Sequence, residues 1–268
     1  MDISPSALQK ELERRVRNRE NLTGVNLTGS DLIGANLAGA YLVGANLSCA
    51  DLLSANLAGA NLINANLAGA ELVGANLNSA LLRSADLRHA NLAFACCVGA
   101  RIINADLGRA RLSNTNLTRA TLERSYLGGA RLAGALLRGA HLKGANLGGA
   151  NLAGADMVCA DMVSVSLAGA NLAGANLAGA ILLAADLKGA DLTGADLTGA
   201  DLTGADLTGA DLRSASIVDT DLTHATLISA DFRAATLDRA KFNGANLYEA
   251  NFTEVDLRKV DLSCAYGR

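Results

Sequence analysis

The chain has 268 residues and a formal net charge of −3, and half of its residues are hydrophobic although only 3% are aromatic. So few aromatic side chains would leave a conventional globular core short of bulk, yet apolar burial is plentiful. No stretch reaches the roughly 18 uninterrupted apolar residues of a membrane-spanning helix, because a polar residue or Gly interrupts every unit. The start of the chain has neither a basic lead nor an apolar core of a signal peptide, so we expect a cytoplasmic protein without a membrane partner.

Residues 1–20 are predicted to form a capping helix that is separate in kind from the rest of the chain. Ser4 is placed to cap it with Pro5 in its first position, and Ile3 is placed to pack on Leu8. One apolar face, expected to cover the edge of the following segment, carries Leu8, Leu12 and Val16. A basic amphipathic helix that binds a membrane or a partner is the alternative, but three Glu residues dilute its charge.

Residues 21–268 are predicted to form one domain built from a repeat of five residues. Every fifth residue from Leu22 to Leu262 is hydrophobic, and 41 of these 49 positions are Leu. The residue two positions earlier is usually Ala, which gives the unit A-(D/N)-L-x-x. A repeat this strict has to be interpreted before any local structure.

A period of five fits neither a helix nor a strand. On an α-helix each step of five advances by roughly 140°, which would spread the Leu series around the whole cylinder. In a strand an odd repeat sends alternate Leu residues to opposite faces. The pattern instead predicts a chain that turns a corner after every unit, with all Leu side chains directed at a common axis.

These units resemble those of the pentapeptide repeat family, over nearly the whole chain from about Leu22 to Ala265. The resemblance implies an all-β fold, a right-handed quadrilateral β-helix of about 12 coils in which residues 20 apart are stacked. Leu and Ala would point inward, and the Asp or Asn and the last two residues of each unit would face solvent. At about 4.8 Å per coil the rod would be about 58 Å long.

Asn occupies the position before Leu in most of the first coils. Stacked Asn amides can form hydrogen-bonded ladders along a face, or each Asn can instead bond to its own turn backbone. Both interpretations are structural, and the sequence leaves them open. The residues concerned are Asn21, Asn26, Asn36, Asn46, Asn56, Asn61, Asn66 and Asn76.

Charge is distributed unevenly along the predicted rod. Residues 81–145 have a local balance of +7, and residues 186–268 have a balance of −6. In the coil geometry Arg111 stacks over Arg131, whereas a series of Asp residues passes around all four faces as an anionic cuff. The candidate interaction surface therefore comprises Asp191, Asp196, Asp201, Asp206, Asp211, Arg111 and Arg131. A solvated surface without a specific role explains both regions equally well.

No capping helix is predicted at the C-terminal end, so the unpaired backbone groups of the last coil have to be covered in another way. Phe232, Phe242 and Phe252 are placed either to plug wider coils or to contribute to a dimer seam. Some relatives in the family pair through their C-terminal coils. The expected dimer end comprises Phe252, Leu257, Leu262 and Tyr266, and pairing of two acidic ends would strengthen with salt.

Nothing in the sequence indicates catalysis, a cofactor or a metal. His89, His141 and His224 lie in different units, and no Ser-His-Asp or H-E-x-x-H arrangement occurs. The five Cys residues form no C-x-x-C pair, as suits reduced thiols. We therefore expect that the protein is not an enzyme.

The sequence favours a scaffold or protein-interaction rod with an unknown protein partner. The alternative comes from the resemblance: members of the family that confer quinolone resistance mimic DNA and bind DNA gyrase, a type II topoisomerase. The basic region of 81–145 disfavours that alternative. Direct nucleic-acid binding is also disfavoured, because the basic residues spread over all faces without interleaved aromatic residues.

Overall fold

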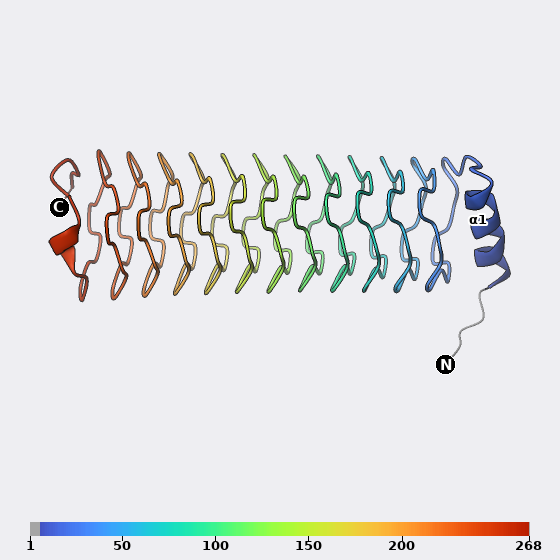
Figure 1. Cartoon of the computed structure of the whole chain (residues 1–268), viewed down its shortest axis with the longest axis horizontal. Helices are drawn as coiled ribbons and strands as arrows, with labels where there is room; N and C mark the ends of the chain where they lie inside the picture. Colours follow the sequence, from blue (N-terminus) through green and yellow to red (C-terminus); the bar gives the residue numbers. More distant parts are fainter. Residues whose placement is uncertain (1–5, 268) are drawn as a thin grey trace.

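The computed structural model describes residues 6–267, which form a straight rod with a helix at its N-terminal end (Figure 1). Parallel β-bridges link residues 20 apart, from Asn21 with Tyr41 to Asn246 with Tyr266. Four units of five residues therefore make one coil, and each coil stacks on the one before it. The predicted right-handed quadrilateral β-helix is confirmed.

Hydrogen bonds between coils explain why a unit of five residues suffices. The Leu142 N–H donates to the Asp161 carbonyl at 2.7 Å, and the Asp161 N–H donates to the Ala140 carbonyl at 2.9 Å. Within the unit the Ala145 N–H donates to the Leu142 carbonyl at 2.9 Å and closes a tight turn. Each side of the square thus has one bridging residue followed by a corner.

The last residue of each unit from Gly24 to Glu254 adopts a left-handed backbone conformation at the corner. Gly supplies it at many corners, such as Gly134 with a φ of 66°. Arg109, Arg119 and Arg124 adopt the same conformation, with φ between 55° and 57°. Because this region disfavours side chains, the regular hydrogen bonds of the coils must hold these corners in place.

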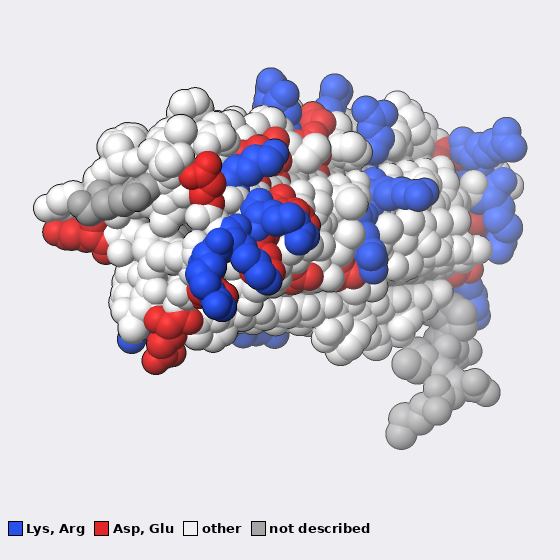
Figure 2. Space-filling model, turned by 60° about the vertical axis from the view of Figure 1, so that its left-hand side comes forward, with Lys and Arg blue, Asp and Glu red and all other residues white. Residues whose placement is uncertain are grey.

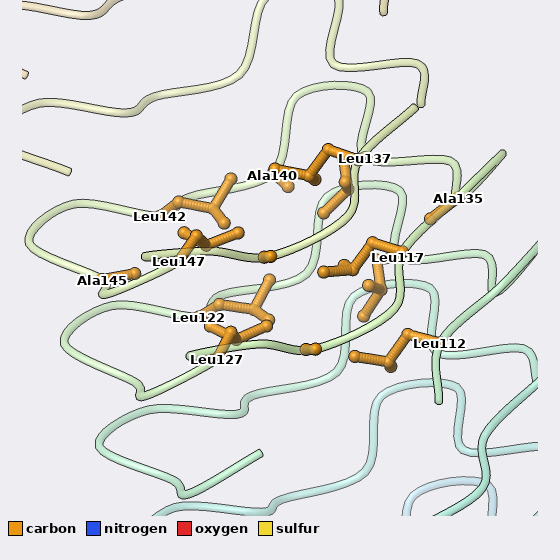
Figure 3. Packing of buried hydrophobic residues seen from close by; sticks show 14 of the residues in the cluster. Leu112, Leu117, Leu122, Leu127, Ala135, Leu137, Ala140, Leu142, Ala145 and Leu147 are labelled. Carbon is orange, nitrogen blue, oxygen red and sulfur yellow. The ribbon is translucent and has the colours of Figure 1, made fainter. Parts of the chain in front are cut away.

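The core is a continuous thread of Leu and Ala along the rod axis. Leu147 is completely buried, as are Leu142 and Leu127. Figure 3 shows Leu142 and Leu147 inside the coil, lying over Leu122 and Leu127 of the neighbouring coil. Burial of each Leu stabilises the rod by about 2 kcal/mol.

Three hydroxyl groups replace Ala methyl groups inside the core. Thr115 and Thr220 each donate a hydrogen bond of 2.7 Å to a backbone carbonyl of a preceding coil, from Leu92 and Leu197 respectively. The Ser125 hydroxyl donates to the Ile102 carbonyl in the same way. These polar groups are tolerated because each has a partner.

The N-terminal helix α1 (Ala7–Arg17) covers the first coil, but it begins later than predicted. Ser6 caps it, its hydroxyl accepting from the Gln9 N–H at 3.0 Å; Ile3, Ser4 and Pro5 lie outside the described residues. Leu12 is buried and Val16 is partly buried against the core. Leu8 is 43% exposed, so its predicted place in the apolar face is wrong.

A side chain of α1 also completes the backbone edge of the first coil. The Glu13 carboxylate accepts a hydrogen bond of 3.0 Å from the Asn36 N–H. One coil later, the equivalent N–H of Asn56 donates to the Ala35 carbonyl of the preceding coil. The Glu13 carboxylate therefore takes the place of the backbone carbonyl that a preceding coil would supply.

The C-terminal end departs from the repeat. A short 3-10 helix, η1 (Leu257–Lys259), interrupts the last coil, and the bridge expected between Thr236 and Asp256 is absent from the described residues. Leu257 is 38% exposed, although the repeat predicts an inward side chain. The five-residue period alone does not detect this break, because Leu257 keeps the phase of the Leu series.

Three Phe side chains pack together just before η1. Phe232 and Phe252 are stacked with ring centroids 4.8 Å apart, and Phe242 contacts both edge-on at 6.2 and 6.4 Å. Phe232 and Phe242 are buried, and Phe252 is partly buried. The aromatic cluster fills the last coils, as the plug hypothesis predicts.

Candidate interaction surfaces

The three His residues do not come together. His89 and His224 occupy corners in distant coils, and His141 lies on a face with its Nδ1 3.9 Å from an Asp161 carboxylate oxygen. Among residues 6–267, no group of three or more His, Cys, Asp or Glu side chains is arranged to hold a metal ion. In the same range no helix is long and apolar enough to cross a membrane.

The Cys residues are separate thiols in the described part of the chain. Cys97 takes a Leu position in the core, where burial raises its pKa to about 12. Its thiolate is therefore disfavoured, and Cys97 acts as a small apolar residue.

The Asn residues of the first coils use both predicted interactions. Asn36, Asn56 and Asn76 form a ladder in which each side-chain amide donates to the carbonyl of the Asn one coil earlier, at 3.2 and 3.3 Å. The same three residues also accept a hydrogen bond from the backbone N–H two residues later, as do Asn21 at 2.8 Å and Asn66 at 3.0 Å. The turn interaction is the more common of the two along the rod.

All five Asp residues of the candidate surface stabilise turns, and three of them have no ion-pair partner among the described residues. Asp191, Asp196 and Asp201 each accept a hydrogen bond of 2.9 to 3.0 Å from the N–H of the Thr two residues later. No Lys or Arg of the described chain lies within 4.0 Å of these three carboxylates. They keep their charge at the surface while stabilising the corner.

The other two Asp residues of this surface, Asp206 and Asp211, are paired with cations. Lys188 lies 2.8 Å from Asp206, and Arg213 lies 2.6 Å from Asp211. The Arg213 hydrogen bond lowers the pKa of Asp211. Burial raises the pKa of Asp206, but hydrogen bonds from Lys188 and Thr208 outweigh it and the pKa is lowered. The cuff is thus less anionic than the sequence alone predicts.

Further ion pairs form in the part of the described chain between the cuff and its C-terminal end. Arg233 pairs with Asp231, Arg258 with Asp256, and Lys259 with Asp238. Each described Lys or Arg after residue 186 has a carboxylate within 4.0 Å, namely Lys188, Arg213, Arg233, Arg239, Lys241, Arg258 and Lys259. In Figure 2 several blue side chains on the C-terminal half lie against red ones.

The basic region between residues 81 and 145 differs. Arg88 pairs with Asp86 at 2.6 Å and Arg138 pairs with Asp156 at 3.1 Å. Figure 2 shows other blue side chains on white surface in the middle of the rod. The basic residues of this region with no described carboxylate within 4.0 Å are Arg83, Arg101, Arg109, Arg111, Arg119, Arg124, Arg131 and Lys143.

Three of these unpaired Arg residues line one open depression of about 510 Å³ at a corner of the rod. Arg111 and Arg131 are bridged in adjacent coils, in the stacked geometry that the sequence predicts. Arg109 occupies the corner itself. The full lining is Glu71, His89, Asn91, Arg109, Arg111, Gly129 and Arg131. We call this depression the arginine notch.

Tyr126 lies beside the arginine notch, and sequence reasoning missed it. It lines a second depression of about 170 Å³ together with His89 and Arg109, which also line the notch. Its ring lies over the backbone of Gly108 and Gly128, since a Cβ on Gly108 would lie 3.0 Å from the ring Cε1. The ring is still 50% exposed. The sequence does contain a signal for this ring position: Gly108 and Gly128 follow Leu in two successive coils and leave space beside Tyr126.

The four residues of the expected dimer end lie together at the last coil but differ in burial. Phe252 and Leu262 are partly buried against the core, whereas Leu257 is 38% and Tyr266 59% exposed. Asp256, which the sequence places in an acidic seam, is paired with Arg258. Dimerisation through this end stays a prediction.

The sequence profile of pentapeptide repeats matches the chain over nearly its whole length. The chain therefore belongs to the pentapeptide repeat family. No protein with a curated description matches it. The matched residues are 21–57, 55–93, 95–134, 130–167, 160–199, 190–227 and 227–263.

Solved structures of the same family are similar to this rod. HetL, a pentapeptide repeat protein involved in heterocyst differentiation regulation in the cyanobacterium Nostoc sp. strain PCC 7120, is 32% identical, with 91% of this chain and 96% of that chain covered and a TM-score of 0.42. A trypsin-treated form of QnrB1, a plasmid-mediated fluoroquinolone resistance protein, is 17% identical, with coverage of 91% and 89% and a TM-score of 0.44. A thylakoid-lumen protein of Arabidopsis thaliana is 26% identical over 43% of this chain.

Proposed function

We propose that this protein is a non-enzymatic rod that binds a protein partner through the exposed side chains of its middle coils. The observation that carries the proposal is the group of unpaired Arg residues between 81 and 145. Arg side chains without a carboxylate partner are available to an acidic surface, and electrostatic complementarity favours encounter and orientation. The rigid Leu core holds these side chains at fixed spacings of one coil.

Co-purification from the native host tests this function. The full chain, tagged at one end, is expected to capture a defined protein in low salt and to release it as salt rises, because surface charges are screened. A rod that captures nothing above the tag control under these conditions contradicts the proposed function.

Protection of a type II topoisomerase through DNA mimicry is the second candidate. The surface Asp residues Asp191, Asp196 and Asp201 favour it, because each lies on a different face and none is paired with a described cation. A supercoiling assay with DNA gyrase and a fluoroquinolone tests it. Restored supercoiling in the presence of the protein would support the candidate, and unchanged inhibition would remove it.

A further inference from the structure

The arginine notch and the depression beside Tyr126 lie next to each other at one corner of the rod. His89 and Arg109 line both depressions, and we call the two depressions together the furrow. We propose that this furrow binds a short acidic segment of a protein partner, with carboxylates on the Arg side chains and an apolar side chain on Tyr126. This inference rests on the proposed function as an interaction rod and names the chemistry that the rod recognises.

The Arg side chains of the arginine notch have no carboxylate partner among the described residues. The Glu71 carboxylate in the notch accepts a hydrogen bond of 2.7 Å from the Asn91 side chain. No carboxylate within the described residues lies within 4.0 Å of Arg109, Arg111 or Arg131. Guanidinium groups bind carboxylates through paired, charge-assisted hydrogen bonds, so a row of them selects an acidic ligand.

Tyr126 supplies the apolar part of the furrow. One face of its ring is covered by the backbone at Gly108 and Gly128, and half of the side chain stays exposed. A ring held against the backbone loses little conformational freedom when a ligand packs on it. Tyr and Arg are also the residue types that contribute most strongly to protein interfaces.

Carboxylates also line the two depressions and disfavour a long, uniformly anionic ligand. Glu71 lines the notch, and Asp106 lines the depression beside Tyr126, where it accepts from the Gly108 N–H at 2.9 Å and lies 3.8 Å from Arg88. A nucleic-acid strand carries one charge per nucleotide and would meet these carboxylates as well as the Arg group. A peptide can place its acidic residues on the Arg side chains and neutral or basic residues beyond them.

The backbone of the furrow offers no strand edge to the ligand. The Arg111 N–H donates to the Ala90 carbonyl, and the Arg131 carbonyl accepts from the Leu112 N–H. Recognition therefore depends on side chains, and its strength should fall as salt is added.

Panning of a random-peptide phage library on the immobilised full chain tests the proposal. We expect enriched peptides with two or more Asp or Glu residues near an aromatic or aliphatic residue. The most enriched peptide, labelled with fluorescein, is then titrated with the protein by fluorescence anisotropy. A labelled oligodeoxythymidine of similar length is titrated in parallel.

The decisive comparison uses two double variants that are matched in charge and in backbone position. Arg109→Glu with Arg111→Glu changes one corner residue and one bridging residue of the furrow. Arg119→Glu with Arg101→Glu changes the same two kinds of position outside it, again in unpaired, exposed Arg residues. We expect the first pair of substitutions to raise the Kd for the peptide by about tenfold or more. The second pair should change this Kd by less than about twofold. Tyr126→Ala should also weaken binding of the peptide, and Tyr126→Phe should not.

Three results would overturn the proposal: no enrichment of acidic peptides, equal loss in both double variants, or tighter binding of the oligodeoxythymidine than of the peptide. Circular dichroism melting of each variant shows whether the rod is intact, and Tyr126→Phe provides a conservative second probe. A host protein that the furrow variant and the parent capture equally well would leave the interaction function standing and remove this site alone.

Discussion

The middle of the rod and its C-terminal third share one core and differ in what their surface charges contact. Between residues 81 and 145 the described structure leaves eight of ten basic side chains without a carboxylate within 4.0 Å. After residue 186 each described basic side chain has one. Regional net charge therefore does not tell which charges a partner can reach.

A core substitution provides the largest expected effect and compares the two regions directly. Leu147→Ala should lower the free energy of unfolding by about 2–4 kcal/mol, because it removes a completely buried side chain and leaves a cavity. Leu257→Ala, in the exposed η1, should cost less than about 1 kcal/mol. Urea denaturation of both variants measures the difference.

Leu147→Asp should be more damaging still, because it places an unpaired charge on the rod axis. The inward position of the Leu series is contradicted if Leu147→Ala and Leu147→Asp both melt within about a degree of the parent protein.

The buried hydroxyl groups test whether the two regions share the same core energetics. Thr115→Val and Thr220→Val each remove the hydroxyl that donates to a buried carbonyl, of Leu92 or Leu197, while each carbonyl keeps the backbone N–H donor three residues later. Each should cost about 0.5–1.5 kcal/mol, and the two costs should agree. A large cost at Thr115 with none at Thr220 would show that the C-terminal coils are more loosely packed than the middle.

Dimerisation through the C-terminal end is expected to be weaker than the effects of the core substitutions and to depend on salt. A tail-to-tail dimer would be about 116 Å long, twice the length expected from the coil spacing. Because Arg258 neutralises Asp256, we now expect only a weak strengthening by salt. Small-angle scattering at two salt concentrations measures length and mass. A monomer in both, at high protein concentration, would contradict the dimer.

The smallest expected effect is on carboxyl groups at the acidic end. Arg213 lowers the pKa of Asp211 in the folded protein, so this pair stabilises the fold above the unfolded pKa of about 3.9 and loses its effect as pH falls through the folded pKa. Arg213→Gln should raise the pKa of Asp211 toward its ordinary value. The stability difference from the parent should disappear in acid.

Arg111→Gln is the matched control in the middle of the rod, because no described carboxylate lies within 4.0 Å of Arg111. It should leave the carboxyl titrations unchanged. Carboxyl-detected NMR titration of both variants measures these pKa values, and a shift of equal size in both would show that the Arg111 charge acts on the acids at long range.

Periodicity predicted a coiled chain around one axis, because the repeat requires each Leu to face that axis, and the family resemblance supplied the right-handed quadrilateral form. The periodicity did not predict the break at Leu257, where the residue type keeps the pattern while the backbone leaves it. The start of α1 was predicted too early: Ser6, which that prediction puts inside the helix, has an extended backbone and caps it.

The surface was less predictable, although part of the signal was present. Asp211 and Arg213 are two residues apart on the same side of the chain, and Asp86 with Arg88 repeats this spacing. The motif D-L-R therefore marks a neutralised charge. Arg109 and Arg111 have no Asp at that spacing, and the place of Arg109 beside Tyr126 depends on which residues the corner brings together.

Residue-resolved reactivity of the Arg side chains tests the contrast between the two regions most directly. The full chain is treated with a phenylglyoxal reagent at low extent, and mass spectrometry gives a rate for each Arg. We expect Arg109, Arg111 and Arg131 to react faster than Arg258. The Arg258 side chain is 88% exposed, but its ion pair with Asp256 protects the guanidinium from the reagent. Equal rates, or faster modification of Arg258, would contradict the conclusion that the middle of the rod carries the available charge.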